Sequence, residues 1–265
     1  MADMEHANAF GLESVAITRI KDGTREQAED VVAREVPLTL NVGGRELATL
    51  QCSPGDLDDF VRGFLFTSGI VKDAAQITAI TLDQQRWSCD VDITGSDAAD
   101  LAFKRLYTSG CGRGALFYNP LDIMYRTPLV SGLRMKAAAI STLMREFLQR
   151  SEGFAATGGV HGAALATEEA LVVFREDIGR HNAIDKAVGA VLAHGGTFDD
   201  KVLVSSGRTS SEVIFKARRC GIAIVASKSA PTDQAVKLAR DMGITVIGFA
   251  RGTRMNIYSV DERIL

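Results

Sequence analysis

Short aliphatic runs alternate with helix-like segments through the second half of this chain, and this alternation constrains the fold more than any other feature. The runs that resemble strands cover residues 159–166, 171–174, 202–204, 222–226 and 244–249. The helical segments among them cover residues 179–192, 211–219 and 232–242. Strands this short and apolar are typical of a sheet that is covered on both faces. We therefore predict an α/β fold for residues 131–265, with a mostly parallel sheet and helices on both faces.

The first 130 residues predict a smaller α+β region. A hairpin is expected over residues 36–50, where Gly43 and Gly44 form the turn. Apolar residues at helical spacing then predict a helix that ends near residues 68–69: Leu57, Phe60, Val61, Phe64 and Leu65. Two short strands and a helix over residues 97–107 complete this region. A long amphipathic helix, with Ser131 as its N-cap, opens the second region.

Charge and hydropathy limit the classes of function. The 265 residues carry a net charge of −3, so the chain lacks the overall positive charge that favours nucleic-acid binding. No apolar run approaches the ~20 residues of a membrane span, and the N-terminus is polar with no signal-peptide core. We expect a cytoplasmic protein with neither a nucleic acid nor a membrane as its partner.

One cysteine has neighbours that favour reactivity. Cys111 lies in the segment S-G-C-G-R-G, residues 109–114, where glycines leave the sulfur unshielded. Arg113 favours the thiolate over the thiol, and the thiolate is the nucleophile. The sequence contains no C-x-x-C pair, and three cysteines are expected to be buried and structural: Cys52, Cys89 and Cys220. We interpret Cys111 as a reactive thiol on a mobile loop, and the alternative is an ordinary glycine-rich turn.

Four predicted strands end in segments that hold a cation among small hydroxyl or glycine residues: 175–182, 205–212, 227–232 and 249–254. Ligands of such sheets bind beyond the carboxyl ends of the strands, and helix N-termini there offer free N–H groups to anions. We predict a site for a phosphorylated ligand, with Arg208, Lys228 and Arg251 as phosphate contacts. Serine and threonine at these positions are also common N-caps, which is the alternative interpretation.

Four titratable residues near these ends have more than one possible role. Glu176 and Asp177 either orient the cations, bind a base or ribose edge, or belong to a surface turn. His161 lies in a strand of small residues, where a hydrogen-bonded core histidine is one interpretation. His181 lies at a helix start, where it either caps the helix or faces the ligand.

Five sequence blocks, taken together and in this order, resemble the FdhD family of formate dehydrogenase accessory proteins. They are G-C-G at 110–112, E-D-I-G-R-H-N-A-I-D-K at 176–186, S-S-G-R-T-S-S-E at 205–212, S-K-S-A-P-T at 227–232 and F-A-R-G-T-R at 249–254. The resemblance extends from about residue 15 to the C-terminus. It implies a fold similar to that of cytidine deaminases, usually as a homodimer.

The resemblance also implies a function. Family members are sulfurtransferases that accept sulfur from a cysteine desulfurase as a persulfide, which here would form on Cys111. They pass the sulfur to the molybdenum or tungsten atom of a bis-guanine-dinucleotide pterin cofactor, which is then inserted into formate dehydrogenase. The stretch that matches the family's cofactor-binding segment is Phe249, Ala250, Arg251, Gly252, Thr253 and Arg254.

Two departures qualify what the resemblance implies. Some family members have a second cysteine three positions after the first, where this chain has Gly114, so a single-cysteine relay is expected. Zinc deaminases need H-x-E and P-C-x-x-C, whereas His161 is followed by Gly162 and Ala163. We therefore expect neither deamination nor a catalytic zinc.

Two other functions remain open at this stage. The first is a chaperone that holds the molybdenum cofactor without chemistry at the thiol. The second is an unrelated nucleotide enzyme with His181 or Asp177 as its base.

Overall fold

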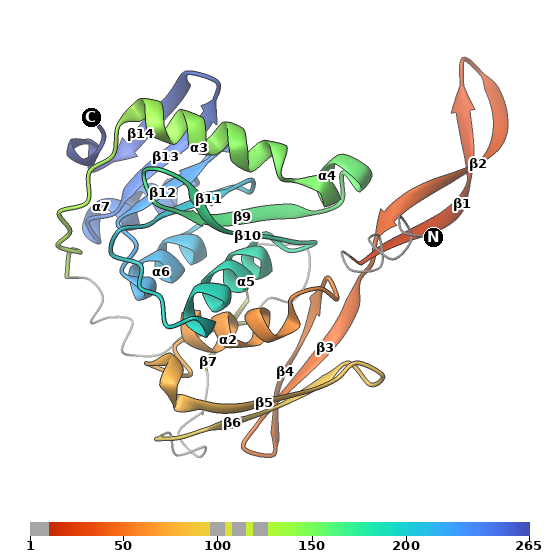
Figure 1. Cartoon of the computed structure of the whole chain (residues 1–265), viewed down its shortest axis with the longest axis horizontal. Helices are drawn as coiled ribbons and strands as arrows, with labels where there is room; N and C mark the ends of the chain where they lie inside the picture. Colours follow the sequence, from red (N-terminus) through yellow and green to blue (C-terminus); the bar gives the residue numbers. More distant parts are fainter. Residues whose placement is uncertain (1–10, 96–103, 108–114, 119–126) are drawn as a thin grey trace.

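The computed structural model describes residues 11–95, 104–107, 115–118 and 127–265. Its centre is a six-stranded mixed sheet in the order β10-β9-β11-β12-β13-β14 (Figure 1). The strands are β9 (His161–Ala166), β10 (Leu171–Asp177), β11 (Val202–Ser205), β12 (Ile224–Ser227), β13 (Thr245–Arg251) and β14 (Arg254–Ser259). Each of the five runs predicted as strands in this half of the chain contributes one strand, and β14 was not predicted.

The expectation of a mostly parallel sheet is wrong. Only β11, β12 and β13 run parallel as neighbours, whereas β9 is antiparallel to both β10 and β11, and β14 is antiparallel to β13. Residues 167–170 are all that separates β9 from β10, and residues 252–253 separate β13 from β14. Connections this short allow only antiparallel neighbours, since a parallel crossover needs a dozen or more residues.

Helices cover both faces of this sheet, as predicted. On one face lie α5 (Arg180–Ala193), α6 (Ser211–Cys220) and α7 (Asp233–Asp241), which share a core with alternate strand residues such as Leu203 and Val225. On the other face α3 (Ala137–Gln149) packs on the intervening residues, such as Val204 and Ala226. This alternation is the period of two that a strand imposes on its side chains.

Helix α3 begins later than its predicted N-cap at Ser131. Backbone N–H groups of Met135 and Ala137 donate to the carbonyls of Arg263 and Leu265, at 2.9 and 2.8 Å. Leu265 N–H donates back to the Met135 carbonyl at 2.9 Å. The segment before α3 is therefore held by the C-terminus of the chain, a pairing that no local pattern reveals.

The N-terminal part forms a four-stranded sheet in the order β4-β3-β6-β5, with one helix against it. The elements are β3 (Val36–Val42), β4 (Arg45–Cys52), α2 (Leu57–Thr67), the short helix η1 (Ala74–Gln76), β5 (Ile77–Asp83) and β6 (Ser88–Ile93). The predicted hairpin and helix are confirmed, and all five apolar residues predicted for one helix face are buried.

Two close helix contacts join the N-terminal part to the central sheet. A Cβ atom on Gly63 of α2 would lie 1.8 Å from the Asp185 carbonyl oxygen of α5. One on Gly189 of α5 would lie 1.8 Å from the Asp59 carbonyl oxygen of α2. Only glycine permits this approach, so α2 is packed between its own sheet and α5.

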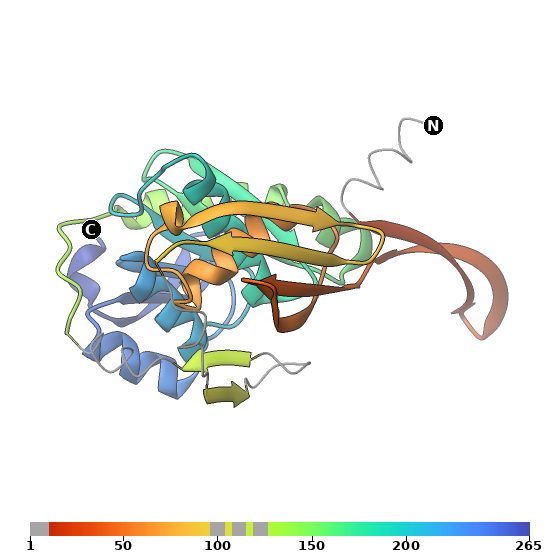
Figure 2. The same cartoon turned by 90° about the horizontal axis from the view of Figure 1, so that it is seen from below.

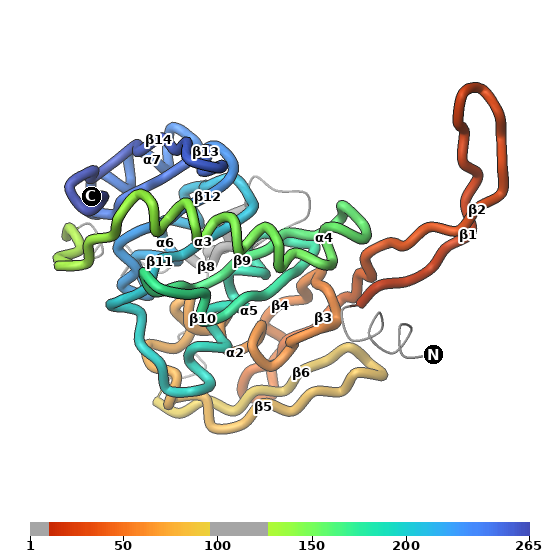
Figure 3. Tube along the Cα trace, turned by 45° about the horizontal axis from the view of Figure 1, so that its top comes forward, coloured from red at the N-terminus to blue at the C-terminus, as the bar shows by residue number. Residues whose placement is uncertain are grey.

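A long hairpin of β1 (Leu12–Lys21) and β2 (Thr24–Ala33), which was not predicted, extends away from the body of the molecule (Figures 1 and 2). The short helix α4 (Glu152–Thr157) lies near its base (Figure 3). Most hairpin side chains are exposed, so the strands lack the one-sided burial that makes a strand easy to predict.

The expected helix over residues 97–107 is wrong for its last part. Lys104–Tyr107 forms strand β7, which pairs antiparallel with β8 (Ala115–Tyr118). Pairing with a partner strand here overrides the local helix preference, because intrinsic propensity is a weak guide. The chain ends in the short helix η3 (Asp261–Arg263).

Candidate functional site

The carboxyl ends of β10, β11, β12 and β13 lie at one edge of the central sheet. Strand β9 runs opposite to its neighbours, so its first residue, His161, pairs with the last residue of β10, Asp177. Ser205 of β11 lies between Ala163 of β9 and Ser227 of β12. The four segments singled out in the sequence therefore meet at one edge, even though the sheet is mixed.

Hydrogen bonds connect the loops at this edge to one another. Ser227 Oγ donates to the Gly207 carbonyl at 2.6 Å and accepts from Ser229 N–H at 3.0 Å. Phe249 N–H donates to the Ser229 carbonyl at 3.0 Å. The Ser227 side chain thus fixes the loop backbones. The alternative interpretation as an N-cap is confirmed for Thr232, whose Oγ1 accepts from Ala235 N–H at 3.3 Å at the start of α7, whereas Ser227 caps no helix.

Positive charges gather around His161. Its Nδ1 lies 3.1 Å from Ser206 Oγ, which also accepts from Gly162 N–H at 3.0 Å. Burial lowers the pKa of His161 below its usual value of 6.5, and the positive charges of Arg180, Lys228 and Arg208 lower it further. His161 is therefore neutral near pH 7, and the cations close to it favour an anionic ligand.

The predicted phosphate contacts differ in exposure. Arg208 is exposed, and Lys228 is half-buried with its Nζ 4.5 Å from the centre of the Phe154 ring. Arg251 is exposed, and its Nε donates to the Lys228 carbonyl at 3.3 Å. Phe154 comes from α4 and was missed in the sequence, where an aromatic residue in so short a helix gives no signal.

The segment Phe249–Arg254 forms the end of β13, a turn and the start of β14. Phe249 and Gly252 have positive φ angles of 52° and 57°, and Ala250 is buried in the core below α3. Arg251 and Arg254 stand directly opposite each other across the hairpin, and both are exposed. The structure therefore exposes the arginines, Phe249 and the turn, and keeps the Ala250 side chain inside.

Asp177 is a buried structural residue and cannot serve as a base. Its Oδ2 lies 2.7 Å from Lys186 Nζ and accepts from Ser53 N–H at 2.9 Å. Its Oδ1 accepts from Gly179 N–H at 2.8 Å and from Asn182 Nδ2 at 2.9 Å. Both carboxylate oxygens of Asp177 are therefore occupied by partners inside the protein. Asp177 neither orients the cations at the sheet edge nor binds a base or ribose edge, and it is not part of a surface turn.

Glu176 holds α4 in place. Its carboxylate accepts from Gly153 N–H at 2.9 Å and from Phe154 N–H at 3.2 Å. Burial raises the pKa of Glu176, although these two N–H groups oppose the rise. Glu176 thereby fixes the backbone of Phe154, whose ring contacts Lys228.

His181 pairs with Glu212 across the first turns of α5 and α6, with Nε2 3.2 Å from Oε2. Burial, reinforced by the charges of Lys216 and Arg180, lowers the pKa of His181 to about 2. A histidine with such a pKa stays neutral and is a poor general base near pH 7. Its pairing favours a structural role over that of a base.

A second buried ion pair links the two parts of the chain and was missed in the sequence. Lys216 Nζ of α6 lies 2.7 Å from Asp185 Oδ1 of α5, and Thr67 Oγ1 of α2 donates to the same oxygen at 2.6 Å. The spacing of these residues gives no signal, because they lie on three separate helices.

Cys111 and the rest of its loop lie outside the described residues, and so does the prediction that this loop moves. The other three cysteines are buried, as expected. Burial raises the pKa of each thiol to about 12. Thiols with such pKa values are protonated near pH 7 and are poor nucleophiles.

The fold and the site define an α/β protein with a cluster of cationic side chains at the carboxyl edge of its central sheet. The family model that matches is the FdhD/NarQ family, over residues 33–265. The chain is 42% identical over 260 residues to the sulfur carrier protein FdhD of Geobacillus kaustophilus, covering 97% of this chain and 99% of that one. It is 40% identical over 250 residues to the protein of the same name from Bacillus subtilis, covering 94% and 95%. This chain belongs to the FdhD/NarQ family.

A solved structure shares the fold. It is described as a formate dehydrogenase accessory protein from Desulfotalea psychrophila, with a TM-score of 0.78 and 28% sequence identity. The match covers 96% of this chain and 99% of that one. In the part of the chain that the structure describes, no helix is long and apolar enough to cross a membrane.

Proposed function

We propose that this protein is a sulfur carrier that serves formate dehydrogenase, with Cys111 as the residue that holds the sulfur. The proposal rests on the burial of the other thiols: three of the four cysteines are buried, and their pKa values are about 12. Cys111, between glycines and near Arg113, is the remaining candidate nucleophile. The similar proteins from Geobacillus and Bacillus are named sulfur carriers.

The proposed loading step is a thiol–persulfide exchange. The Cys111 thiolate attacks the terminal sulfur of a persulfide on a cysteine desulfurase, a new S–S bond forms, and the donor cysteine leaves as a thiolate. The terminal sulfur would then pass to the metal of the molybdenum cofactor. The S–S bond breaks, its electron pair returns to Cys111 as a thiolate, and the transferred sulfur becomes a sulfide ligand by taking two electrons from the reduced metal of that substrate. The protein therefore acts as a sulfurtransferase, and the molybdenum cofactor is its substrate.

The cofactor is proposed to bind along the carboxyl edge of the central sheet. Arg208, Lys228, Arg251 and Arg254 supply cations for the diphosphate groups of its guanine dinucleotides, and neutral His161 lies near Arg208 and Lys228. Arginine and helix N-termini are common phosphate ligands. The protein would then deliver the sulfurated cofactor to formate dehydrogenase as a homodimer.

Intact-protein mass spectrometry tests the role of Cys111. The wild type and Cys111→Ala are incubated with a cysteine desulfurase and cysteine, and Cys89→Ala serves as the matched control. We expect a gain of one sulfur mass that a reductant removes in the wild type and in Cys89→Ala, and no gain in Cys111→Ala. No gain in the wild type, with a known carrier loaded in parallel, would favour a chaperone that binds the cofactor without sulfur transfer.

A further inference from the structure

Helix α4 carries an aromatic side chain whose ring lies beside a cation of the sheet edge. Lys228 Nζ lies 4.5 Å from the centre of the Phe154 ring, a distance at which an ammonium group and an aromatic face attract each other. Phe154 is 43% exposed and belongs to none of the hydrophobic cores of the described residues. Core packing therefore does not explain why the ring lies there, whereas the contact with Lys228 does.

We propose that Phe154 is a positioning residue, which holds the Lys228 ammonium group at the carboxyl edge of the central sheet for a phosphate group of the ligand. The proposal rests on the proposed function, because it takes Lys228 as a phosphate contact. A lysine side chain is a flexible four-carbon stem, so it loses conformational freedom when it binds an anion. A ring that orders the ammonium group beforehand lowers this cost.

An aromatic ring orders a cation without neutralising it. Among the described residues, no carboxylate forms an ion pair with Lys228. A carboxylate in the place of Phe154 would cancel the charge and compete with a phosphate, whereas a ring carries no net charge. An ammonium group has three N–H donors, so contact with the ring on one side leaves donors for a ligand on the other.

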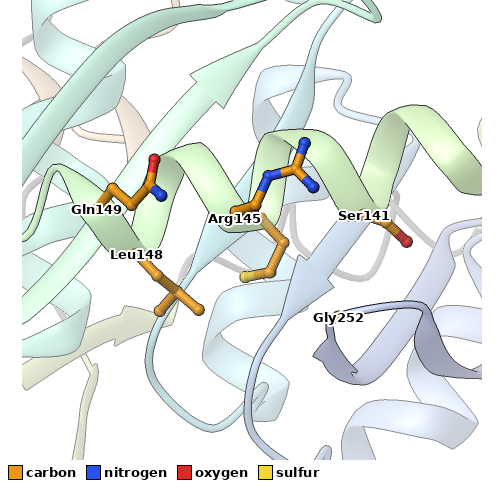
Figure 4. Close-up of a pocket in the computed structure, with 6 residues that line it drawn as sticks. Ser141, Arg145, Leu148, Gln149 and Gly252 are labelled. Carbon is orange, nitrogen blue, oxygen red and sulfur yellow. The ribbon is translucent and has the colours of Figure 1, made fainter.

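The backbone of Lys228 is held by two neighbouring segments. Its N–H donates to the Ser205 carbonyl at 3.3 Å, and its carbonyl accepts from Arg251 Nε at 3.3 Å. Gly252, the residue after Arg251, lines a hollow of about 270 Å³ together with residues of α3, so the turn that follows Arg251 lies beside that helix (Figure 4). With its backbone fixed in this way, Lys228 needs only its side chain ordered, and the Phe154 ring lies where it can do so.

Helix α4 is itself held in the place that this role requires. A helix of six residues is too short to be stable alone. Glu176 near the end of β10 accepts from Gly153 N–H at 2.9 Å and from Phe154 N–H at 3.2 Å. A Cβ atom on Gly153 would lie 2.9 Å from Glu176 Oε2, so glycine permits the close approach of the carboxylate. Glu176 thereby ties the ring to the same sheet edge that carries Lys228.

Calorimetric titration with pyrophosphate tests this role. Phe154→Leu keeps an apolar side chain but removes the aromatic face, and Phe154→Tyr is the matched control that keeps the face. We expect Phe154→Leu to weaken pyrophosphate binding about three- to tenfold, and Phe154→Tyr to bind like the wild type. Because the side chain is largely exposed, both variants should keep the unfolding temperature and the sulfur loading on Cys111 of the wild type.

An NMR titration of His161 reports on the Lys228 ammonium group without any ligand. Burial lowers the pKa of His161, Asp177 opposes this, and three cations lower the pKa further: Arg180, Lys228 and Arg208. In Phe154→Leu the ammonium group is free to move into solvent, so the pKa of His161 should rise, whereas in Phe154→Tyr it should stay. A purely structural role for the ring would leave this pKa the same in both variants.

A double-mutant cycle shows whether Phe154 acts through Lys228. Phe154→Leu should cause no further loss of pyrophosphate affinity in a Lys228→Met background. An equal loss in both backgrounds, wild-type binding by Phe154→Leu, or a loss shared by Phe154→Tyr overturns the positioning role and leaves the anion site standing. No pyrophosphate binding by the wild type overturns the anion site and the positioning role together, whereas sulfur loading on Cys111 reports separately on the carrier role.

Discussion

The buried pair of Lys186 and Asp177 allows a sharp test of how the site is held. Both side chains are fully buried, with Nζ 2.7 Å from Oδ2, and Lys186 Nζ also donates to the Ser53 carbonyl at 3.0 Å. Lys186→Met removes one charge and leaves the carboxylate of Asp177 buried without its cation. Breaking a buried pair in this way costs about 3–5 kcal/mol of unfolding free energy.

This cost is large enough to measure by thermal or urea unfolding. For a chain of this size it corresponds to a midpoint lower by roughly 10 °C. The matched control is Lys237→Met, since Lys237 pairs with Asp233 at 3.4 Å on the exposed face of α7. Exposed pairs contribute little, so the control should unfold like the wild type.

The double variant Lys186→Met with Asp177→Asn completes the test. It removes the stranded charge, so its loss of stability should be smaller than the sum of the two single losses. If Lys186→Met and Lys237→Met unfold at the same midpoint, the assignment of a buried, coupled pair is wrong.

Three further predictions concern pH, packing and charge. The pKa of His181 is about 2 in the folded chain and the ordinary 6.5 in the unfolded chain. Below pH 6.5 the unfolded chain therefore binds a proton that the folded chain does not, and the free energy of unfolding falls as the pH drops. Urea titrations from pH 7 to 4 should show a shallower loss for His181→Gln, and parallel curves would contradict this assignment. Gly63→Ala should lower the unfolding free energy by about 1–3 kcal/mol or more, because its Cβ meets the Asp185 carbonyl, whereas Gly132→Ala, with open space around it, should not. Arg254→Ala should weaken guanosine diphosphate binding. It should keep or raise the unfolding temperature, since it relieves the repulsion between Arg254 and Arg251. A fall in both the affinity and the unfolding temperature would indicate a structural role for Arg254.

Much of the fold follows from local patterns that the sequence carries. The helix face of α2 and the hairpin of β3 and β4 were predicted because their apolar residues repeat with the periods of a helix and a strand. The strand ends with their cations were also visible, since each is a short contiguous segment. The structure shows that these segments share one edge of the sheet.

The features that the sequence did not predict correctly depend on contacts with residues far away along the chain. The start of α3 is set by the C-terminal residues around Arg263, and the direction of β9 by its pairing with both β10 and β11. Lys104–Tyr107 became a strand because a partner strand was present. Secondary structure at these positions is decided by pairing, which a local window does not contain.

The same distinction holds for the site. The sequence by itself determined the chemical groups: the thiol of Cys111 between glycines, and the cations at the strand ends. Only the tertiary structure decided which of these groups are exposed at the sheet edge, because burial and pairing depend on distant contacts. The fold buries Asp177 beside Lys186, so a carboxylate that the sequence left as a ligand candidate is paired inside the protein. The fold also places α3 against Gly252, which forms a hollow between segments far apart in the chain.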